Sequence, residues 1–230
     1  DVPLFPAGHG QQTGEQMAVF RADPGGCGGG HQVLVEGLLR RSGGMLRLLL
    51  AATAPPGIGP EDRHLFACLL TVASREQRDI AAALGLPADD LEALLSRCFP
   101  ACDLQQLSGP KAPPDQAIPA SNSEVRDLLL SHVPRDETGT PRQLSRWLAL
   151  ALAARAAQPG HLWVAMGLLQ RPELSAAIAR RLPSLAAAND KGMRWKRYLF
   201  REVCKLNGGL LCKSPNCGVC SDYALCFGSD

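Results

Sequence analysis

The chain has 230 residues, 46% of them hydrophobic, and a formal net charge of +2. This composition is ordinary for a protein that buries a core, and the balanced charge excludes a strongly basic nucleic-acid binder or an acidic tail protein. The length predicts one domain, or one domain with appendages. Apolar runs are short and broken by charge, so we expect no membrane span. The chain begins at Asp1 without a methionine, which suggests a trimmed or fragmentary N-terminus, and no basic-then-apolar signal peptide opens it.

Residues 1–58 are expected to form a variable, partly flexible N-terminal region. The segment Pro24–Gly30 is rich in glycine, as flexible linkers are. Leucines recur at helical spacing between Gln32 and Ala54, and a Gly-Gly pair at 43–44 interrupts them. This pattern predicts two short helices, followed by a break at Ala54–Gly59.

Residues 59–206 are expected to form a compact multi-helix domain of the all-α class. Alternation of β-branched and aromatic residues is nearly absent, whereas leucine and alanine, which favour helices, dominate. Pro60 suits a helix start, Gly85 a helix end, and Thr140 a helix cap. The helices predicted from Pro60 onward continue with Arg75–Leu84, Pro87–Phe99, Asn122–His132, Pro141–Gln158, His161–Gln170, Pro172–Leu182 and Asn189–Leu206.

Residues 207–230 are predicted to be a cysteine-rich tail that folds around metal. Of nine cysteines in the chain, five fall in the last 27 residues, and four of these follow a C-x4-C-x2-C-x5-C spacing. Four thiols so close in sequence can converge on one small centre. The spacing of the first three matches that of plant-type ferredoxins, which hold iron–sulfur clusters through thiolates. The four residues are Cys212, Cys217, Cys220 and Cys226.

Three kinds of site are compatible with this spacing. Two local disulfides would fit a secreted scaffold, but the odd cysteine count and the length favour a reducing compartment such as the cytoplasm. A four-cysteine zinc site is compatible, although such sites usually pair two C-x2-C knuckles and only one is present. An iron–sulfur or mixed-metal cluster is the third kind, and the one we favour.

The segment before and within the motif is strongly basic. Between residues 191 and 213 seven basic residues face a single acidic one, Glu202. A thiolate-rich cluster is anionic, and so is an oxyanion such as molybdate, so this charge favours a role near the metal or in docking an acidic partner. A solvated helix face is the alternative explanation. The basic residues are Lys191, Arg194, Lys196, Arg197, Arg201, Lys205 and Lys213.

The C-terminal sequence resembles the NifQ family of nitrogen-fixation proteins. The resemblance rests on Met193–Cys204 and Leu211–Gly228, with further likeness at Gly160–Trp163 and Arg171–Leu174. Upstream, Arg63–Cys68 extends it, so that it covers residues 60–228. The resemblance implies a cluster of molybdenum, iron and sulfide held by the four motif cysteines.

The same resemblance implies a carrier of this metallocluster and not an enzyme. It would supply molybdenum for biosynthesis of the nitrogenase iron–molybdenum cofactor (FeMo-cofactor). The implied partners are the cofactor-assembly scaffold NifEN, the nitrogenase reductase NifH and molybdate. The alternative is a zinc- or iron–sulfur-stabilised regulatory or interaction protein.

Further candidate ligands come from the residues themselves. Cys204 lies eight residues before Cys212 and could approach a cluster, while His161 and Asp222 carry the nitrogen and oxygen donors that molybdenum could use beyond sulfide. His64 and Cys68 stand four apart and therefore share a helix face, where they could bind metal or simply pack.

Two predicted helices joined by a turn at Gly85 resemble a helix-turn-helix DNA reader. The first turn of the second helix carries Asp89, Asp90 and Glu92, where a DNA reader would contact phosphate. Acidic side chains repel phosphate, so we expect an antiparallel helix pair and no nucleic-acid binding.

Overall fold

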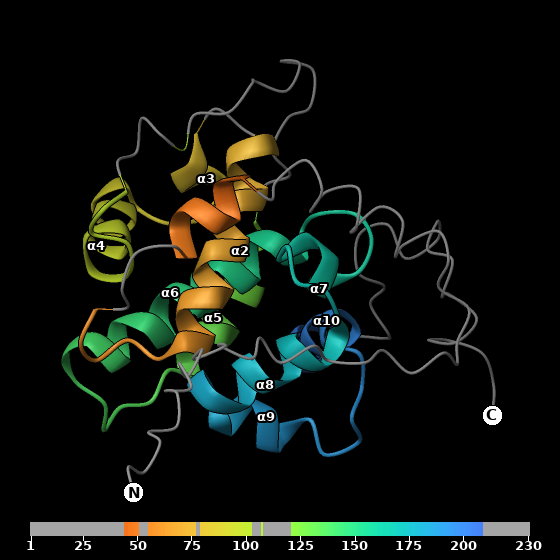
Figure 1. The fold of residues 1–230 in the computed structure, drawn as a ribbon. Coiled ribbons are helices and arrows are strands. Elements are labelled where there is room, and N and C mark those ends of the chain that lie inside the picture. Colours follow the sequence, from red (N-terminus) through yellow and green to blue (C-terminus); the bar gives the residue numbers. More distant parts are fainter. Residues whose placement is uncertain (1–43, 51–54, 77–78, 103–106, 108–120, 209–230) are drawn as a thin grey trace, which may run out of the picture.

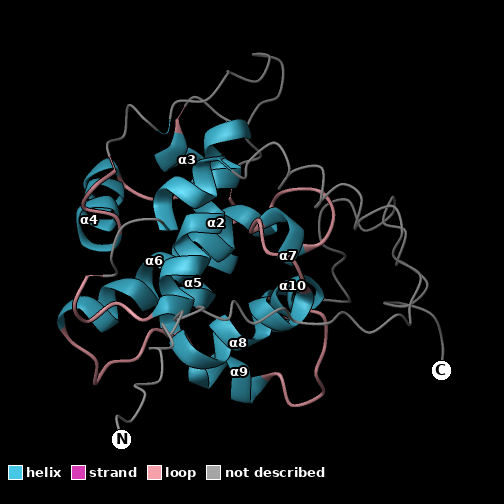
Figure 2. Cartoon of the chain, viewed as in Figure 1, coloured by secondary structure: helices cyan, strands magenta, loops and turns pink. Residues whose placement is uncertain are grey.

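The computed structural model describes residues 44–50, 55–76, 79–102, 107 and 121–208. Every regular element within these residues is a helix, as Figure 2 shows, and no strand occurs among them. The predicted all-α class is therefore confirmed for this part of the chain. Most of the N-terminal region 1–58 and of the tail 207–230 lies outside it, as do residues 108–120.

A short helix covers residues 44–50, which matches the second of the two predicted N-terminal helices. The helices that follow, labelled in Figure 1, are α2 (Pro60–Glu76), α3 (Ile80–Leu84), α4 (Ala88–Cys98), α5 (Ser123–Ser131), α6 (Gly139–Ala156), α7 (Leu162–Ala165), α8 (Arg171–Arg181), α9 (Pro183–Ala188) and α10 (Trp195–Leu206).

Helices α2 and α6 form the centre of the molecule (Figure 1). Alanine and leucine fill α6 on all sides, and a helix that is apolar all round belongs in a core. Trp147 of α6 is fully buried and meets Phe66 of α2 edge to face, with ring centroids 6.3 Å apart. Helices α3, α5 and α7 pack on α6, and α8 packs on α2.

Several helix boundaries differ from the predicted ones for local reasons. The second predicted helix was placed too early: α2 continues to Glu76, and α3 begins at Ile80 because Asp79 caps it, accepting a 2.9 Å hydrogen bond from the Ala82 amide. The predicted Thr140 cap is wrong. Helix α6 already begins at Gly139, and the Thr140 hydroxyl accepts a hydrogen bond from Arg97 instead.

The C-terminal third also differs from the prediction. Helix α7 is a single turn, and α9 follows α8 directly because Leu182 ends one helix and begins the next. Helix α10 begins at Trp195 and not at Asn189. The Asn189 side chain donates to the Met193 carbonyl and accepts from the Met193 amide, both at 2.9 Å, so residues 189–193 form a closed loop.

Two buried charge clusters join distant helices. Arg155 of α6 is fully buried, and its guanidinium contacts both carboxylate oxygens of Glu76 at 2.7 and 3.0 Å. Asp62, 1% exposed, accepts hydrogen bonds from Arg180 and Arg181 at the end of α8. Although burial opposes it, these two arginines hold the pKa of Asp62 below its usual value.

No helix among the described residues is long and apolar enough to cross a membrane.

Candidate functional site

The four motif cysteines and Asp222 lie outside the described residues, so the structure leaves these predictions untested. What it does describe is the helix that leads to them. Helix α10 ends at Leu206, and Gly208 follows with a positive φ of 65°, a conformation that suits glycine after a helix. The Asn207 side chain donates a 2.7 Å hydrogen bond to Glu124 of α5. The point at which the tail leaves the helical domain is therefore fixed against α5.

The apolar face of α10 anchors the helix in the domain. Trp195, Tyr198, Leu199 and Val203 are buried, and the Trp195 and Tyr198 rings meet edge to face at 5.9 Å. The indole of Trp195 donates a 2.9 Å hydrogen bond to the Ser175 hydroxyl of α8. A helix held by such contacts gives the following segment a rigid base.

Cys204, the additional candidate ligand, lies near the end of α10 and is 4% exposed. It belongs to the last turns of the helix, next to the start of the tail. Its position is compatible with a contact to the motif, but the motif itself is not described.

Four basic residues follow one stripe of α10. Arg194, Arg197, Arg201 and Lys205 are spaced by three or four residues, which places them above one another on a helix. Lys205 pairs with Glu202 at 2.6 Å, and an Arg201 nitrogen lies 2.9 Å from the Met193 sulfur. A thioether is only a weak acceptor, so it leaves most of the Arg201 charge available to an anion.

Lys196, another basic residue of this segment, has a structural role. Its ammonium donates to the backbone carbonyls of Gln158 and Gly160, the latter at 3.3 Å. These carbonyls follow the C-terminal end of α6, where the helix dipole favours a positive charge. Lys196 therefore ties the first turn of α10 to the turn before α7.

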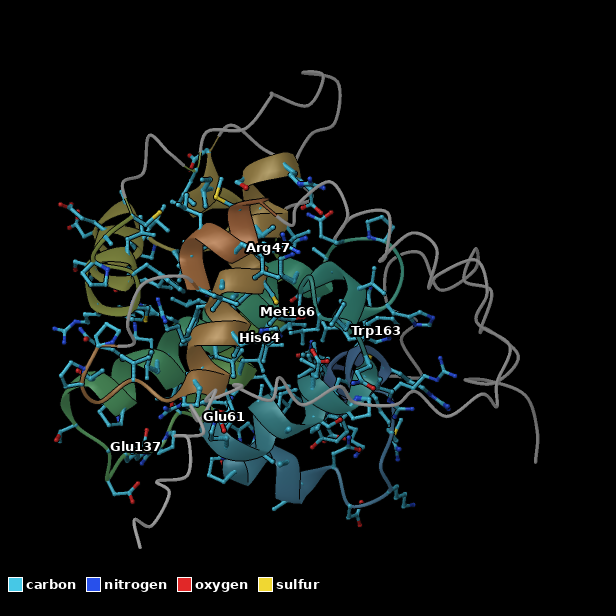
Figure 3. The ribbon with its side chains drawn as sticks, in the orientation of Figure 1. Arg47, Glu61, His64, Glu137, Trp163 and Met166 are labelled. Atoms are coloured by element: carbon cyan, nitrogen blue, oxygen red, sulfur yellow. The ribbon has the colours of Figure 1, made fainter. Side chains whose placement is uncertain are left out.

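The hydrogen bonds of Lys196 bring the residue before His161 close to the first turn of α10. His161 precedes α7 directly after Gly160, and its ring is nearly parallel to that of Trp163, with an interplanar angle of 10° and centroids 6.3 Å apart. Figure 3 labels Trp163 on this side of the molecule. His161 thus lies near the first turn of α10, whereas the tail begins after the last. At ~1.5 Å per residue the helix is roughly 18 Å long. A motif cysteine could therefore contact His161 only if the tail returned along the helix.

A second group of candidate residues is brought together by α2 and α8. The His64 Nε2 atom lies 3.5 Å from the Cys68 sulfur and 3.8 Å from a Glu173 oxygen. Hydrogen bonds to Cys68 and Glu173 raise the pKa of His64 to about 10. The predicted shared face of His64 and Cys68 is therefore confirmed. The part played by Glu173 was missed, because no local pattern connects it with residue 64.

Two further described cysteines lie on or just after α4. Cys98 is fully buried, and burial raises the pKa of its thiol to about 12. Cys102 lies beyond the end of α4 and is partly exposed. Within the described ranges, no group of three or more His, Cys, Asp or Glu side chains stands at metal-binding spacing.

Helices α3 and α4, the pair whose sequence resembles a helix-turn-helix DNA reader, pack against the rest of the domain. Asp90, in the first turn of α4, accepts a 3.0 Å hydrogen bond from the Trp147 indole and forms an ion pair with Arg146 of α6 at 2.5 Å. The turn that a DNA reader would present to phosphate thus holds α4 against α6.

Comparison with known proteins identifies relatives over most of the chain. The family model described as NifQ matches residues 65–228, which include most of α2, all of α3 to α10 and the whole cysteine motif. Protein NifQ of Rhodobacter capsulatus is 41% identical over 66% of this chain and 79% of its own length.

Two further relatives have the same name. The NifQ homolog of Sinorhizobium fredii is 34% identical over 73% of this chain and 72% of its own length. Protein NifQ of Azotobacter vinelandii is 31% identical over 68% of this chain and 85% of its own length. No solved structure matches the chain.

Proposed function

We propose that this chain, which belongs to the NifQ family, carries a molybdenum–iron–sulfur cluster and supplies molybdenum for the nitrogenase iron–molybdenum cofactor. Family membership implies a role in nitrogen fixation and molybdenum handling. The observation that carries the finer proposal is that the family match continues to residue 228 and so includes all four motif cysteines.

The donor set suits a cluster of this kind. Iron in iron–sulfur clusters is held by cysteine thiolates, and the motif offers four: Cys212, Cys217, Cys220 and Cys226. Thiolates and sulfide together make the cargo anionic. The basic stripe of α10, from Arg194 to Lys205, lies just before the motif and offsets that charge.

Molybdenum in such a cluster needs donors beyond sulfide. The residues we propose for this role are His161, Asp222 and Cys204, which offer nitrogen, oxygen and sulfur. His161 is supported by its position beside the first turn of α10, to which Lys196 ties the preceding turn.

The proposed activity is transfer of a cargo and not catalysis. A carrier has to accept molybdenum, which reaches it as molybdate, and give it up again, so its site should be accessible. A cysteine-rich segment that follows a packed helical domain meets that need. The receiving partners we propose are NifEN and NifH, in the cytoplasm. The alternative, a zinc- or iron–sulfur-stabilised regulatory protein, is an outcome of the metal analyses below.

Alanine variants of the motif test the assignment. Cys→Ala at Cys212, Cys217, Cys220 or Cys226 should remove iron and molybdenum from anaerobically purified protein, because each change deletes a thiolate ligand. The matched control is Cys98→Ala, which removes a buried thiol of α4 and should leave both metals in place. Iron retained at the wild-type level in Cys220→Ala would contradict the assignment.

A second series separates the molybdenum ligand from the iron ligands. His161→Gln should lower the molybdenum content and leave iron unchanged if the ring is a ligand of molybdenum. Equal loss of both metals would show that His161 supports the whole cluster, and no loss would remove it from the ligand set.

A further inference from the structure

The cluster of His64, Cys68 and Glu173 is distinct in sequence from the cysteine motif, and the proposed function does not use it. Both the Cys68 sulfur and a Glu173 oxygen approach the same ring nitrogen of His64, at 3.5 and 3.8 Å. Figure 3 labels His64 on α2, near the middle of the molecule. A thiol, an imidazole and a carboxylate therefore meet at the contact between α2 and α8.

The sulfur is buried but its partners are not. Cys68 is 3% exposed, whereas the side chains of His64 and Glu173 are 37% and 26% exposed. On its other side, the backbone of Cys68 packs against Gly167: a Cβ at that glycine would lie 2.7 Å from the Cys68 carbonyl oxygen. The part of this cluster that solvent reaches is therefore His64 and Glu173, and the sulfur lies directly behind the histidine.

A positive charge lies beside the Cys68 sulfur. Because hydrogen bonds to Cys68 and Glu173 raise the pKa of His64 to about 10, the ring is a cation at neutral pH. Electropositive surroundings of this kind are typical of reactive cysteines.

Cys98 is the natural comparison, because it is equally inaccessible and has the opposite surroundings. It is fully buried in α4, and burial, with a contribution from the Asp62 carboxylate, raises the pKa of its thiol to about 12. The two cysteines thus differ in electrostatics and hardly at all in exposure.

We propose that Cys68 is a reactive thiol paired with His64, and that small hydroperoxides oxidise it to a sulfenic acid. The Cys68 thiolate attacks one peroxide oxygen, so that an S–O bond forms and the O–O bond breaks. With hydrogen peroxide, the displaced hydroxide takes the Nε2 proton of His64 and leaves as water. The sulfur loses an electron pair and the peroxide gains it, so the reaction needs no further co-reactant.

Glu173 is a positioning residue in this account. It contacts the same nitrogen of His64 as the sulfur does, whereas the carboxylate of a hydrolase triad holds the opposite ring nitrogen. Hydrolytic turnover is therefore not part of the proposal. The carboxylate keeps the ring charged and in contact with Cys68.

The test compares two cysteines of one molecule. The full chain is treated with hydrogen peroxide, its sulfenic acids are trapped with a small dione, and tryptic peptides are quantified by mass spectrometry. Trypsin releases Cys68 in the peptide His64–Arg75, and Cys98 in Cys98–Lys111, where fragmentation distinguishes it from Cys102. We expect Cys68 to react at least ~10-fold faster than Cys98, because His64 places a cation in contact with the Cys68 sulfur.

Two variants separate the role of the histidine from simple access. His64→Gln should slow oxidation of Cys68 by roughly tenfold and leave Cys98 unchanged, because it removes the cation. Glu173→Gln should slow oxidation of Cys68 less than His64→Gln does. It should also lower the pH at which the His64 ring loses its proton, and with it the pH above which His64 no longer assists oxidation, because the carboxylate beside the ring is gone. Circular dichroism confirms that each variant is folded.

Equal rates at Cys68 and Cys98 in the wild-type chain would overturn the proposal, and so would an unchanged Cys68 rate in His64→Gln. No added molybdenum or iron enters the measurement, so its outcome does not depend on the proposed carrier function.

Discussion

Single residues control contacts between distant helices in this protein, and His64 does so through its charge. Its ring joins Cys68 on α2 to Glu173 on α8, and these two partners raise its pKa from 6.5 to about 10. A group whose pKa is raised on folding stabilises the folded state at low pH. That stabilisation is complete below pH 6.5 and is lost as the pH rises to about 10.

We therefore predict a pH-dependent effect of His64→Gln on the free energy of unfolding. The variant should be less stable than the wild type by about 1 kcal/mol near neutral pH, since the partly exposed ring is screened by solvent. The difference should shrink toward zero as the pH approaches 10. Urea denaturation of both proteins across this range measures it. A difference that stays constant with pH would show that the contact does not depend on the imidazolium charge.

The sequence predicted individual residues well where the relevant contact is local. A spacing of four placed His64 and Cys68 on one helix face, and their atoms are indeed in contact. It failed for Thr140, because a hydroxyl beside a helix start can also accept from a distant group, here Arg97. Glu173 could not be assigned, since only tertiary packing brings it to His64.

At the scale of helices, the contact between α7 and α2 depends on Gly167. The residue has a φ of 73°, and an added Cβ would lie 2.7 Å from the Cys68 carbonyl oxygen and 3.3 Å from the Val72 Cβ. Both the backbone conformation and the space require glycine. This close approach holds the chain after α7 against the middle of α2.

Gly167→Ala should lower the free energy of unfolding by about 2–4 kcal/mol, because it combines backbone strain with overpacking against a rigid carbonyl. Gly57→Ala is the matched control: its φ is 82°, but nothing lies within 4 Å of an added Cβ. The control should cost only about 1 kcal/mol, the strain alone. Thermal unfolding of the three proteins provides the comparison, and equal losses in both variants would show that α7 can move away from α2.

Helix positions were predictable where caps and prolines mark them. Asn122, the predicted start of α5, caps that helix, and Gly85 ends α3 with a φ of 64°. Helix α9 was missed because Pro183 follows the end of α8 and its six residues are too short to show a period. The start of α10 was placed too early because the Asn189–Met193 loop depends on a side-chain contact that composition does not reveal.

At the scale of the whole molecule, ion pairs join helices that are far apart in the sequence. Arg155 joins α6 to α2 through Glu76, and Asp62 joins α2 to the end of α8 through Arg180 and Arg181. These partners are far apart in sequence, so no periodicity predicts them. The helical class followed from composition, whereas the packing of the helices did not.

For the candidate site too, the sequence predicted some features and not others. The cysteine spacing and the family resemblance were readable from the sequence, and the family is confirmed by the match over residues 65–228. The sequence did not predict the point at which the tail leaves the helical domain. It depends on Trp195, Lys196 and Asn207, whose contacts with α8, with the turn after α6 and with α5 fix α10 in the domain.

The central claim is that the four motif cysteines hold a cluster of molybdenum, iron and sulfide. Its most direct test is the content of iron, molybdenum, acid-labile sulfide and zinc in the anaerobically purified full chain. We expect the purified chain to contain iron and sulfide together with molybdenum, and little zinc. Zinc alone, at a single ion per chain, would contradict it and favour a structural zinc site.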